Sequence, residues 1–301
     1  MVRTQVVAGL VFCTLAVPAL ALNNRSAVSI NGLDTNPCTP ASPCRSFGAA
    51  IAQTNPGGEI IALDSAGYGP FTVSVTMTIS GAPGVHAAIT ATSSDAIDVS
   101  GTGTEVVTLR NLALIGAAGG QGIVVTQTAE VRVLNCLVKD FPSYGITHLS
   151  GRLIVDRSTF LDDGFGVSVN GSVVPVQAVI INSLIEKCGN CVAILGAATA
   201  TITNCVIAGG SNGVDVGSSP LVSGVITAAV IESSTLAYNN VAVLATASGS
   251  NNSVIVYLAQ DNISFSPTGV STSGAATVKT FGNNRFEQVT TVGTLSAVAL
   301  Q

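Results

Sequence analysis

The sequence predicts an all-β fold, a single-stranded right-handed parallel β-helix in which the chain winds into a stack of similar coils. Three observations lead to this prediction: the composition, a repeated pair of short phrases, and the lack of a helical period between them. Only 9% of the residues are charged and 4% are aromatic, whereas Gly contributes 32 residues. Such a chain is too apolar to be disordered, and its wealth of β-branched residues favours strands over helices.

The first phrase of the repeat is a polar residue, usually Asn, followed within three residues by an apolar position, as in "INSLI" and "TNCVI". Its polar anchors recur every 22 to 29 residues, at Asn111, Asn135, Arg157, Asn182, Asn204, Ser233, Asp261 and Asn283. Each coil would supply about three short strands that pair with neighbouring coils roughly 4.8 Å away. Inward Asn residues at the turns would form hydrogen-bonded ladders.

The second phrase is Gly followed by Val or Ile, and it advances in step with the first. It occurs at Gly122-Ile123, Gly145-Ile146, Gly166-Val167, Cys191-Val192, Gly213-Val214, Asn240-Val241 and Gly269-Val270. We expect this column to mark a turn that needs positive φ or a close backbone approach. No interval contains a 3.6-residue period, so leucine-rich and βα-type repeats fit poorly.

Residues 1–21 have the pattern of a secretory signal peptide. Arg3 precedes the apolar core "VVAGLVFCTLAVPAL", and small residues predict cleavage after Ala21. A retained membrane anchor would need about 20 apolar residues, more than this core offers. Lipidation at Cys13 is disfavoured because bulky Phe12 precedes it. We therefore expect a secreted or periplasmic protein that has no membrane span once the signal is removed.

The charge of the exported chain argues against a nucleic-acid partner. Removal of Arg3 leaves ten basic and 16 acidic residues, a net charge of −6, with no basic stripe to neutralise phosphates. Residues 188–214 carry no charge, but Asn, Thr, Ser and Gly interrupt them repeatedly. We interpret this stretch as buried parallel strand and turn, where nearly continuous apolar runs are expected.

Two segments would follow the signal: an N-terminal cap over 22–56, with a cysteine loop and a short helix, and the β-helix over 57–301. A solenoid needs caps because exposed end coils would recruit other chains. The helix would lie within 45–54, with Phe47 and Ile51 on one face. "NPGG" would end it and "EIIAL" would begin the first strand, while "TVGTLSAVALQ" is the candidate C-terminal cap.

An even number of cysteines remains after export: Cys38, Cys44, Cys136, Cys188, Cys191 and Cys205. The proline-held loop "NPCTPASPC" favours a Cys38–Cys44 disulfide. Cys188 and Cys191 have CxxC spacing, but the βαβ context of a redox motif and the four ligands of a zinc site are missing. For this pair the expectation is a local disulfide or two free thiols. Cys136 and Cys205 lie about 14 Å apart in the predicted stack, beyond disulfide reach, and fit small buried hydrophobes.

The block "DTNPCTPASPCRSFGAAIAQTNPGGEIIALDSAGYG" resembles the N-terminal block of secreted bacterial β-helix proteins of the pectin-lyase-like superfamily. The shared features are the proline-flanked cysteine pair, the helix after it, the Gly-Gly-Glu-Ile strand entry and the "GYG" that follows. The repeats extend the resemblance over nearly the whole mature chain. It implies the fold but no single activity, because the superfamily includes lyases, hydrolases, epimerases and adhesins.

The densest charge cluster of the chain falls at one predicted corner. Three successive coils would place there the pairs Lys139-Asp140, Asp162-Asp163 and Glu186-Lys187. In a catalytic interpretation Asp162, Asp163 and Glu186 would do acid–base work or bind Ca²⁺, and Lys187 would shift their pKa values or bind an acidic sugar. In the alternative, which the sequence favours, the corner is a solvated turn with ion pairs worth about 0–1 kcal/mol each.

The resemblance also argues against catalysis. Polygalacturonase-type hydrolases have adjacent aspartates too, accompanied by Gly-His-Gly and Arg-x-Lys segments. Here His86 and His148 are flanked differently and no Arg-x-Lys occurs. No pectate-lyase motif accompanies the charged corner, and the chain has no Trp and only four Tyr, of which Tyr144 alone lies near the cluster in sequence.

We therefore predict a secreted, non-enzymatic β-helix protein without cofactors, with a structural role or a role in binding extracellular polysaccharide or a cell surface. The alternative is a polysaccharide lyase or glycoside hydrolase that uses Asp162, Asp163, Glu186 and Lys187, with Ca²⁺ as a cofactor only in that case. The longest insertions, "VNGSVVPVQ", "GSSPLVSG" and "ATASGSNNS", all follow the Gly-Val strand. They would project from one side of the solenoid, where repeat proteins often bind their partners.

Overall fold

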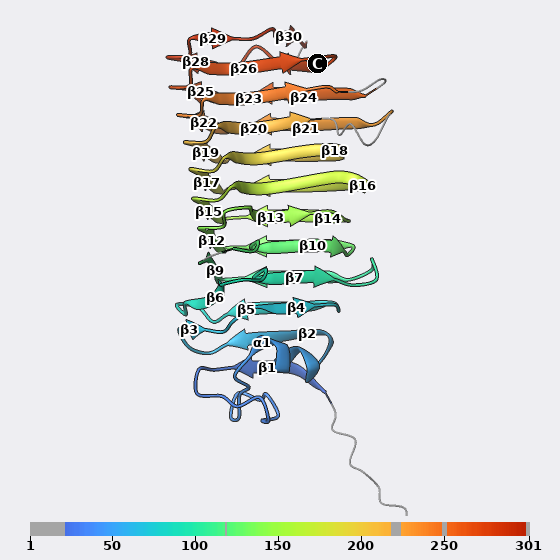
Figure 1. Ribbon diagram of the computed structural model, residues 1–301, viewed down its shortest axis with the longest axis vertical. Helices are drawn as coiled ribbons and strands as arrows, with labels where there is room; N and C mark the ends of the chain where they lie inside the picture. Colours follow the sequence, from blue (N-terminus) through green and yellow to red (C-terminus); the bar gives the residue numbers. More distant parts are fainter. Residues whose placement is uncertain (1–21, 118, 218–223, 249–251, 299–301) are drawn as a thin grey trace, which may run out of the picture.

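The computed structural model describes residues 22–117, 119–217, 224–248 and 252–298, which form a parallel β-solenoid of about nine coils (Figure 1). The predicted signal peptide lies outside the described residues. Coils are stacked from the N-terminal end, blue in Figure 1, to the C-terminal end, red. Strands of successive coils pair in parallel throughout, in one sheet of 20 strands and one of 10. The all-β solenoid predicted from the repeat is confirmed.

Each coil contributes strands to three rows, named here in chain order. The first row contains β4 (Phe71–Val73), β7 (Ile97–Ser100), β10 (Ile123–Gln127), β13 (Tyr144–His148), β20 (Asn212–Gly217), β23 (Val241–Thr246), β26 (Thr268–Ser273) and β29 (Thr291–Val292). The second row contains β1 (Asn23–Val28), β2 (Thr54–Ala62), β5 (Met77–Gly81), β8 (Val106–Arg110), β11 (Glu130–Leu134), β14 (Arg152–Asp156), β21 (Ile226–Glu232), β24 (Ser253–Ala259), β27 (Thr277–Thr280) and β30 (Ser296–Ala297). Two long strands, β16 (Phe165–Ile181) and β18 (Asn190–Thr203), run through both of these rows.

The third row forms the smaller sheet. It contains β3 (Ala66–Gly67), β6 (Ala87–Ala91), β9 (Leu112–Gly116), β12 (Leu137–Lys139), β15 (Thr159–Leu161), β17 (Leu184–Glu186), β19 (Val206–Ala208), β22 (Thr235–Ala237), β25 (Asn262–Ser264) and β28 (Arg285–Glu287). Alternate side chains of all three rows point inward, as the two-residue period of a strand requires. They form one core along the solenoid axis, for example through Val138, Phe160 and Ile185 of neighbouring coils.

Two corners flank the third row, and both require left-handed backbone. The first corner, between the second and third rows, holds Asn111, Asn135, Arg157, Asn182, Asn204, Ser233 and Gln260, with φ between 49° and 58°. The second corner, between the third and first rows, holds Asp140, Asp162, Lys187, Gly209, Tyr238, Phe265 and Gln288, with φ between 52° and 69°. The predicted anchor Asp261 is wrong by one position, because Gln260 takes the corner and Asp261 turns its side chain inward, where it is 2% exposed.

The Gly column has a different cause from positive φ. Gly122, Gly145, Gly166 and Gly213 have ordinary negative φ, but a Cβ on any of them would lie 2.3 to 2.6 Å from a carbonyl oxygen of the next coil. Close backbone approach therefore accounts for the column. The predicted member Asn240 is also misplaced, because Val214 pairs with Val243 and the equivalent residue is Ala242.

At the N-terminal end, strand pairing extends into residues 22–56, where the sequence predicted a cap. Strand β1 pairs with β2, and β2 already begins at Thr54 and runs through the "NPGG" that was expected to end a helix. Only a short helix, α1 (Phe47–Ala52), is present, beside β1 and β2 (Figure 1). Ser46 starts it by accepting a hydrogen bond from the Ala49 N–H, 3.2 Å away. The helix predicted over 45–54 as a cap is thus only six residues long, and β1 is the strand at the end of the stack.

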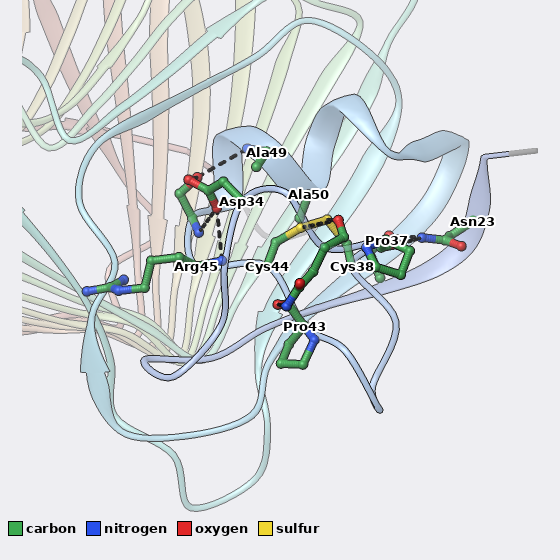
Figure 2. Close-up of a disulfide and its surroundings, with 12 residues drawn as sticks. Asn23, Asp34, Pro37, Cys38, Pro43, Cys44, Arg45, Ala49 and Ala50 are labelled. Carbon is green, nitrogen blue, oxygen red and sulfur yellow. Dashed lines mark hydrogen bonds between the residues drawn. A yellow bond between two sulfur atoms is a disulfide. The ribbon is translucent and has the colours of Figure 1, made fainter. Parts of the chain in front are cut away.

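The predicted Cys38–Cys44 disulfide is confirmed (Figure 2). Its loop is tied back to the start of α1 by Asp34, whose carboxylate accepts hydrogen bonds from the Arg45 and Ser46 N–H groups at 2.9 and 2.8 Å. These bonds lower the pKa of Asp34, although burial opposes them. The disulfide and the carboxylate together hold an irregular loop against the first coils.

Candidate functional site

The six charged residues predicted to share a corner do lie on three successive coils. Asp140 N donates to Leu161 O at 3.0 Å, and Asp162 N donates to Glu186 O at 3.2 Å, which places the coils in register. Lys139 and Asp140 form an ion pair at 2.9 Å. Lys187 is exposed, and among the described residues it takes part in no ion pair.

The adjacent aspartates point in opposite directions. Asp162 is exposed at the corner, whereas Asp163 is 3% exposed and points into the solenoid. One oxygen of Asp163 accepts a hydrogen bond from the Phe141 N–H at 2.9 Å, and the other, among the described residues, has no partner. Burial raises the pKa of Asp163 to about 7, the Phe141 N–H opposes this shift, and the charges of Asp140 and Asp162 add to it. The two carboxylates do not converge on one position outside the protein.

The inward carboxylate of Asp163 belongs to a series of buried acceptors. At the same corner Asn239 accepts from the Gly210 N–H at 2.9 Å, and Ser266 accepts from the Asn239 N–H at 3.2 Å. At the first corner Asp261 accepts from the Ser234 N–H at 2.9 Å. In each case an inward side chain satisfies a backbone donor of the preceding coil, which would otherwise remain unpaired in the core. The geometry of Asp163 therefore matches a structural acceptor.

The second corner continues beyond the charged residues as a line of exposed side chains. Gly209 follows Lys187 along the axis, and Tyr238, Phe265 and Gln288 follow in turn. From Lys187 to Phe265, the backbone N–H of each corner residue donates to a carbonyl of the next coil. The rings of Tyr238 and Phe265 stack with centroids 5.0 Å apart and an angle of 7° between their planes. Bulky residues adopt positive φ at a cost of roughly 1–2 kcal/mol each.

Sequence reasoning missed this aromatic pair, although the signal was present. Tyr238 follows the anchor Ser233 by five residues, the offset that places Asp140, Asp162 and Lys187 at the corner. Phe265 follows Gln260 by the same offset, but the anchor had been placed at Asp261. A second stack, Tyr144 on Phe165 with centroids 4.7 Å apart, lies at the start of the first row.

A groove crosses the outward face of the second row. It consists of two adjoining hollows of about 620 and 330 Å³ that share Arg152, Gln177 and Thr199. The first hollow is bounded by Pro175, from the insertion "VNGSVVPVQ", and by Ile226; the second extends to Tyr257. Strand pairing aligns Arg152, Gln177, Thr199 and Ala228 on successive coils, so the groove follows the solenoid axis. The described residues that line it include no carboxylate, histidine or cysteine.

Arg152 and Tyr257 mark the two ends of the groove. A guanidinium nitrogen of Arg152 lies 3.6 Å from a carboxylate oxygen of Glu130, and half of the Arg152 side chain is exposed. The ammonium of Lys279 lies 5.2 Å from the centre of the Tyr257 ring, within cation–π range. One end therefore has the half-exposed guanidinium of Arg152 and the other has the ammonium of Lys279 beside Tyr257, so each end offers a cation to a ligand. A separate hollow of about 420 Å³ lies between His86 and Asn135, away from the predicted site.

The remaining cysteines are free thiols in the interior: Cys136, Cys188, Cys191 and Cys205. For Cys188 and Cys191 the structure thus has two free thiols and no local disulfide. The hydrogen bond between these thiols raises the pKa of Cys188, and burial raises it further. His148 is also buried, which lowers its pKa to about 4, and its Nε2 lies 3.2 Å from Gly151 O. These groups face the core and not a ligand.

No group of three or more potential metal ligands is found among the described residues. The described part of the chain also contains no helix long and apolar enough to cross a bilayer.

No protein-family model matches the sequence, and no match is found among the curated proteins. Solved structures do match. A rhamnogalacturonan lyase superimposes with a TM-score of 0.60 at 12% identity, over 80% of this chain and 74% of the lyase. The pectate lyase Pel9A gives 0.56 at 14% identity, over 94% and 80% of the two chains. A PL6-family alginate lyase gives 0.57 at 14% identity, over 96% of this chain but 42% of the lyase. Taken with the parallel rows and the two corners, these likenesses show that the chain has the pectin-lyase-like, right-handed parallel β-helix fold.

Proposed function

We propose that this protein is exported and binds an extracellular polysaccharide without cleaving it. The observation that carries the proposal is the groove on the second row, whose described lining offers hydroxyl, amide, aromatic and guanidinium groups but no carboxylate, histidine or cysteine. Such groups hydrogen-bond and stack on sugars, whereas hydrolysis of a glycosidic bond generally needs a pair of carboxyl groups on either side of it.

The dimensions of the groove suit an extended polymer. Arg152 and the coil of Tyr257 are four coil spacings apart, which corresponds to about 19 Å along the axis. Thr199 and Thr201 are exposed between them, with Gln177 beside Arg152. Because a solenoid face is straight, a chain lying along the axis would meet a similar strand at every step.

Export and the likeness to polysaccharide lyases support the same proposal. The pattern of residues 1–21 is that of an export signal. Outside the cytoplasm, in an oxidising compartment, the Cys38–Cys44 disulfide is stable. The similar solved structures are described as lyases of pectate, rhamnogalacturonan and alginate. We carry over from them the class of ligand, a polysaccharide, and not the reaction.

The test is native gel electrophoresis of the protein through gels that contain pectin, alginate or xylan. Wild-type protein should be retarded in at least one gel, and the polymer should keep its length. The double variant Arg152→Ala/Tyr257→Ala should lose about tenfold in affinity, since each side chain closes one end of the groove. Arg285→Ala is the matched control, because Arg285 is an exposed arginine on the third row. Equal retardation of wild type and the groove variant would contradict the assignment of the groove.

The second candidate function is a polysaccharide lyase or hydrolase. The observation that favours it is the pKa of Asp163, raised to about 7 as for a general acid. For catalysis, the buried carboxyl of Asp163 would have to become accessible beside Asp162, with Glu186 and Lys187 in the next coil. Release of oligosaccharides by the wild type, abolished in both Asp162→Asn and Asp163→Asn, would establish this function and overturn binding without cleavage.

A further inference from the structure

At the second corner Gly209, which has no side chain, lies between Lys187 and the exposed stack of Tyr238 on Phe265, and the space over Gly209 is called the slot below. Tyr238 is 65% exposed and Phe265 is 41% exposed. Because the two rings stack along the solenoid axis, one face of Tyr238 is covered by Phe265, and the other faces the coil of Gly209. Gly209 has no side chain to cover that second face.

Lys187 lies on the side of the slot opposite Tyr238. Its N–H donates to Ala208 O at 2.9 Å, and the N–H of Gly209 donates to Ala237 O at 3.1 Å, so that Lys187, Gly209 and Tyr238 occupy three successive coils. The Lys187 γ-carbon would lie 3.6 Å from a Cβ built on Gly209, so the lysine stem borders the space directly. Lys187 is exposed and, within the described chain, free of ion pairs.

The fold alone does not explain the aromatic residues. Left-handed backbone is needed at this corner, and Asp140, Asp162 and Gly209 are residue types suited to it. Lys187 and Gln288 adopt it as well, but of the residues at this corner Tyr238 and Phe265 alone carry aromatic rings. Bulky residues at positive φ are outliers, with φ of 57° for Tyr238 and 53° for Phe265. Such outliers concentrate at functional sites. Two in succession, both with exposed rings, point to a ligand.

We infer that this slot, defined by Lys187, Gly209 and Tyr238, binds one sugar ring that carries a carboxylate. The inference rests on the proposed function and adds a site on a different side of the solenoid from the groove. A pyranose ring has an apolar C–H face that stacks on the open face of Tyr238, and polar edges that remain in water. A carboxylate on that ring would pair with the unengaged ammonium of Lys187. The partner is therefore a polysaccharide that contains uronic acid residues.

Polygalacturonate and the neutral polymer hydroxyethyl cellulose are the probes, again in native gels. Tyr238→Gly removes the ring at a position where Gly is favoured, and Gly209→Asn fills the slot with a residue that tolerates positive φ. Each variant should weaken binding of polygalacturonate about tenfold. Lys187→Gln should weaken binding of polygalacturonate and leave that of hydroxyethyl cellulose unchanged, while Tyr238→Phe, which keeps the ring, should bind within about twofold of wild type.

Thermal unfolding of every variant separates lost binding from lost structure, and Gln288→Asn, at the far end of the corner, is the matched control. If Tyr238→Gly and Gly209→Asn bind polygalacturonate as the wild type does, while Arg152→Ala/Tyr257→Ala does not, the slot is wrong and the proposed function stands. If the wild type binds none of the polysaccharides, the proposed function fails and the slot fails with it. A wild-type dimer in sedimentation that Tyr238→Gly converts to monomer would assign the rings to self-association and overturn the sugar site.

Discussion

The two corners beside the third row share one backbone conformation and differ in the side chains that occupy it. At the first corner, outward amides bond from coil to coil: Asn135 donates to Asn111 at 2.9 Å, and Asn204 donates to Asn182 at 2.7 Å. The second corner holds carboxylates, a lysine and two aromatic rings instead. Asn residues adopt the left-handed backbone at the first corner, and Gly209 adopts it at the second. Because such residues suffice for the backbone, the fold leaves the outward residues of the second corner free to serve binding.

Inside the solenoid the same two corners are alike. Each carries inward acceptors that satisfy a backbone N–H of the preceding coil, through Asp163 and Asn239 at the second corner and through Ser234 and Asp261 at the first. Stability should therefore depend on the inner residues of both corners, and on the outer residues of the first corner only. Four variants test this difference.

The largest effect is expected for Asn239→Leu. Asn239 is fully buried, accepts from the Gly210 N–H at 2.9 Å and donates to Ile207 O at 3.0 Å. Leucine has a similar size but leaves the Gly210 N–H without its acceptor in the core and removes the bond to Ile207 O, which should cost about 3 kcal/mol of unfolding free energy. Urea unfolding followed by circular dichroism measures it. A loss below about 1 kcal/mol would show that the inner ladder contributes little.

The next effect is a pH dependence that the buried carboxyls impose. Burial raises the pKa of Asp163 and that of Asp261 to about 7 in the folded protein, from 3.8. Between these values the folded state binds more protons than the unfolded state, so their contribution to stability is complete below pH 4 and is lost as the pH rises through 7. His148, with its pKa lowered by burial, acts in the opposite direction between pH 4 and 6.5.

The double variant Asp163→Asn/Asp261→Asn isolates this contribution, since His148 is common to both proteins. The unfolding free energy of the variant, relative to that of wild type, should rise steadily between pH 4.5 and pH 8. Asn keeps the acceptor oxygen, as Asn239 does in another coil. A constant difference between the two proteins across this range would mean that neither carboxyl is held protonated.

Much of this architecture could be predicted from the sequence, because the repeat itself encodes it. The offset of five residues from an anchor placed Asp140, Asp162 and Lys187 on one corner correctly. The offset cannot say which of two adjacent residues turns inward, since the left-handed residue reverses the alternation of the strand. For that reason Asp162 and Asp163 could be read as a pair. The groove gave no sequence signal for a different reason, because it depends on how outward side chains pack across coils.

Asn182→Gly tests the outer ladder of the first corner. Asn182 donates to Asp156 at 2.9 Å and accepts from Asn204 at 2.7 Å. Gly keeps the positive φ without strain, so the change removes the two exposed hydrogen bonds alone and should cost about 1 kcal/mol. Thermal unfolding at pH 7 measures it, and no change in Tm would remove the distinction between the corners.

Asp162→Gly is the matched change at the second corner and should alter the unfolding free energy least, by about 0.5 kcal/mol or less, because Asp162 is exposed and Gly tolerates its φ of 57°. It has one specific consequence. The charge of Asp162 helps to raise the pKa of Asp163, so its removal should move the pH-dependent loss of stability to slightly lower pH. A cost equal to that of Asn182→Gly would show that the second corner also holds the coils together, and the argument that its outward residues are free for a ligand would lose its basis.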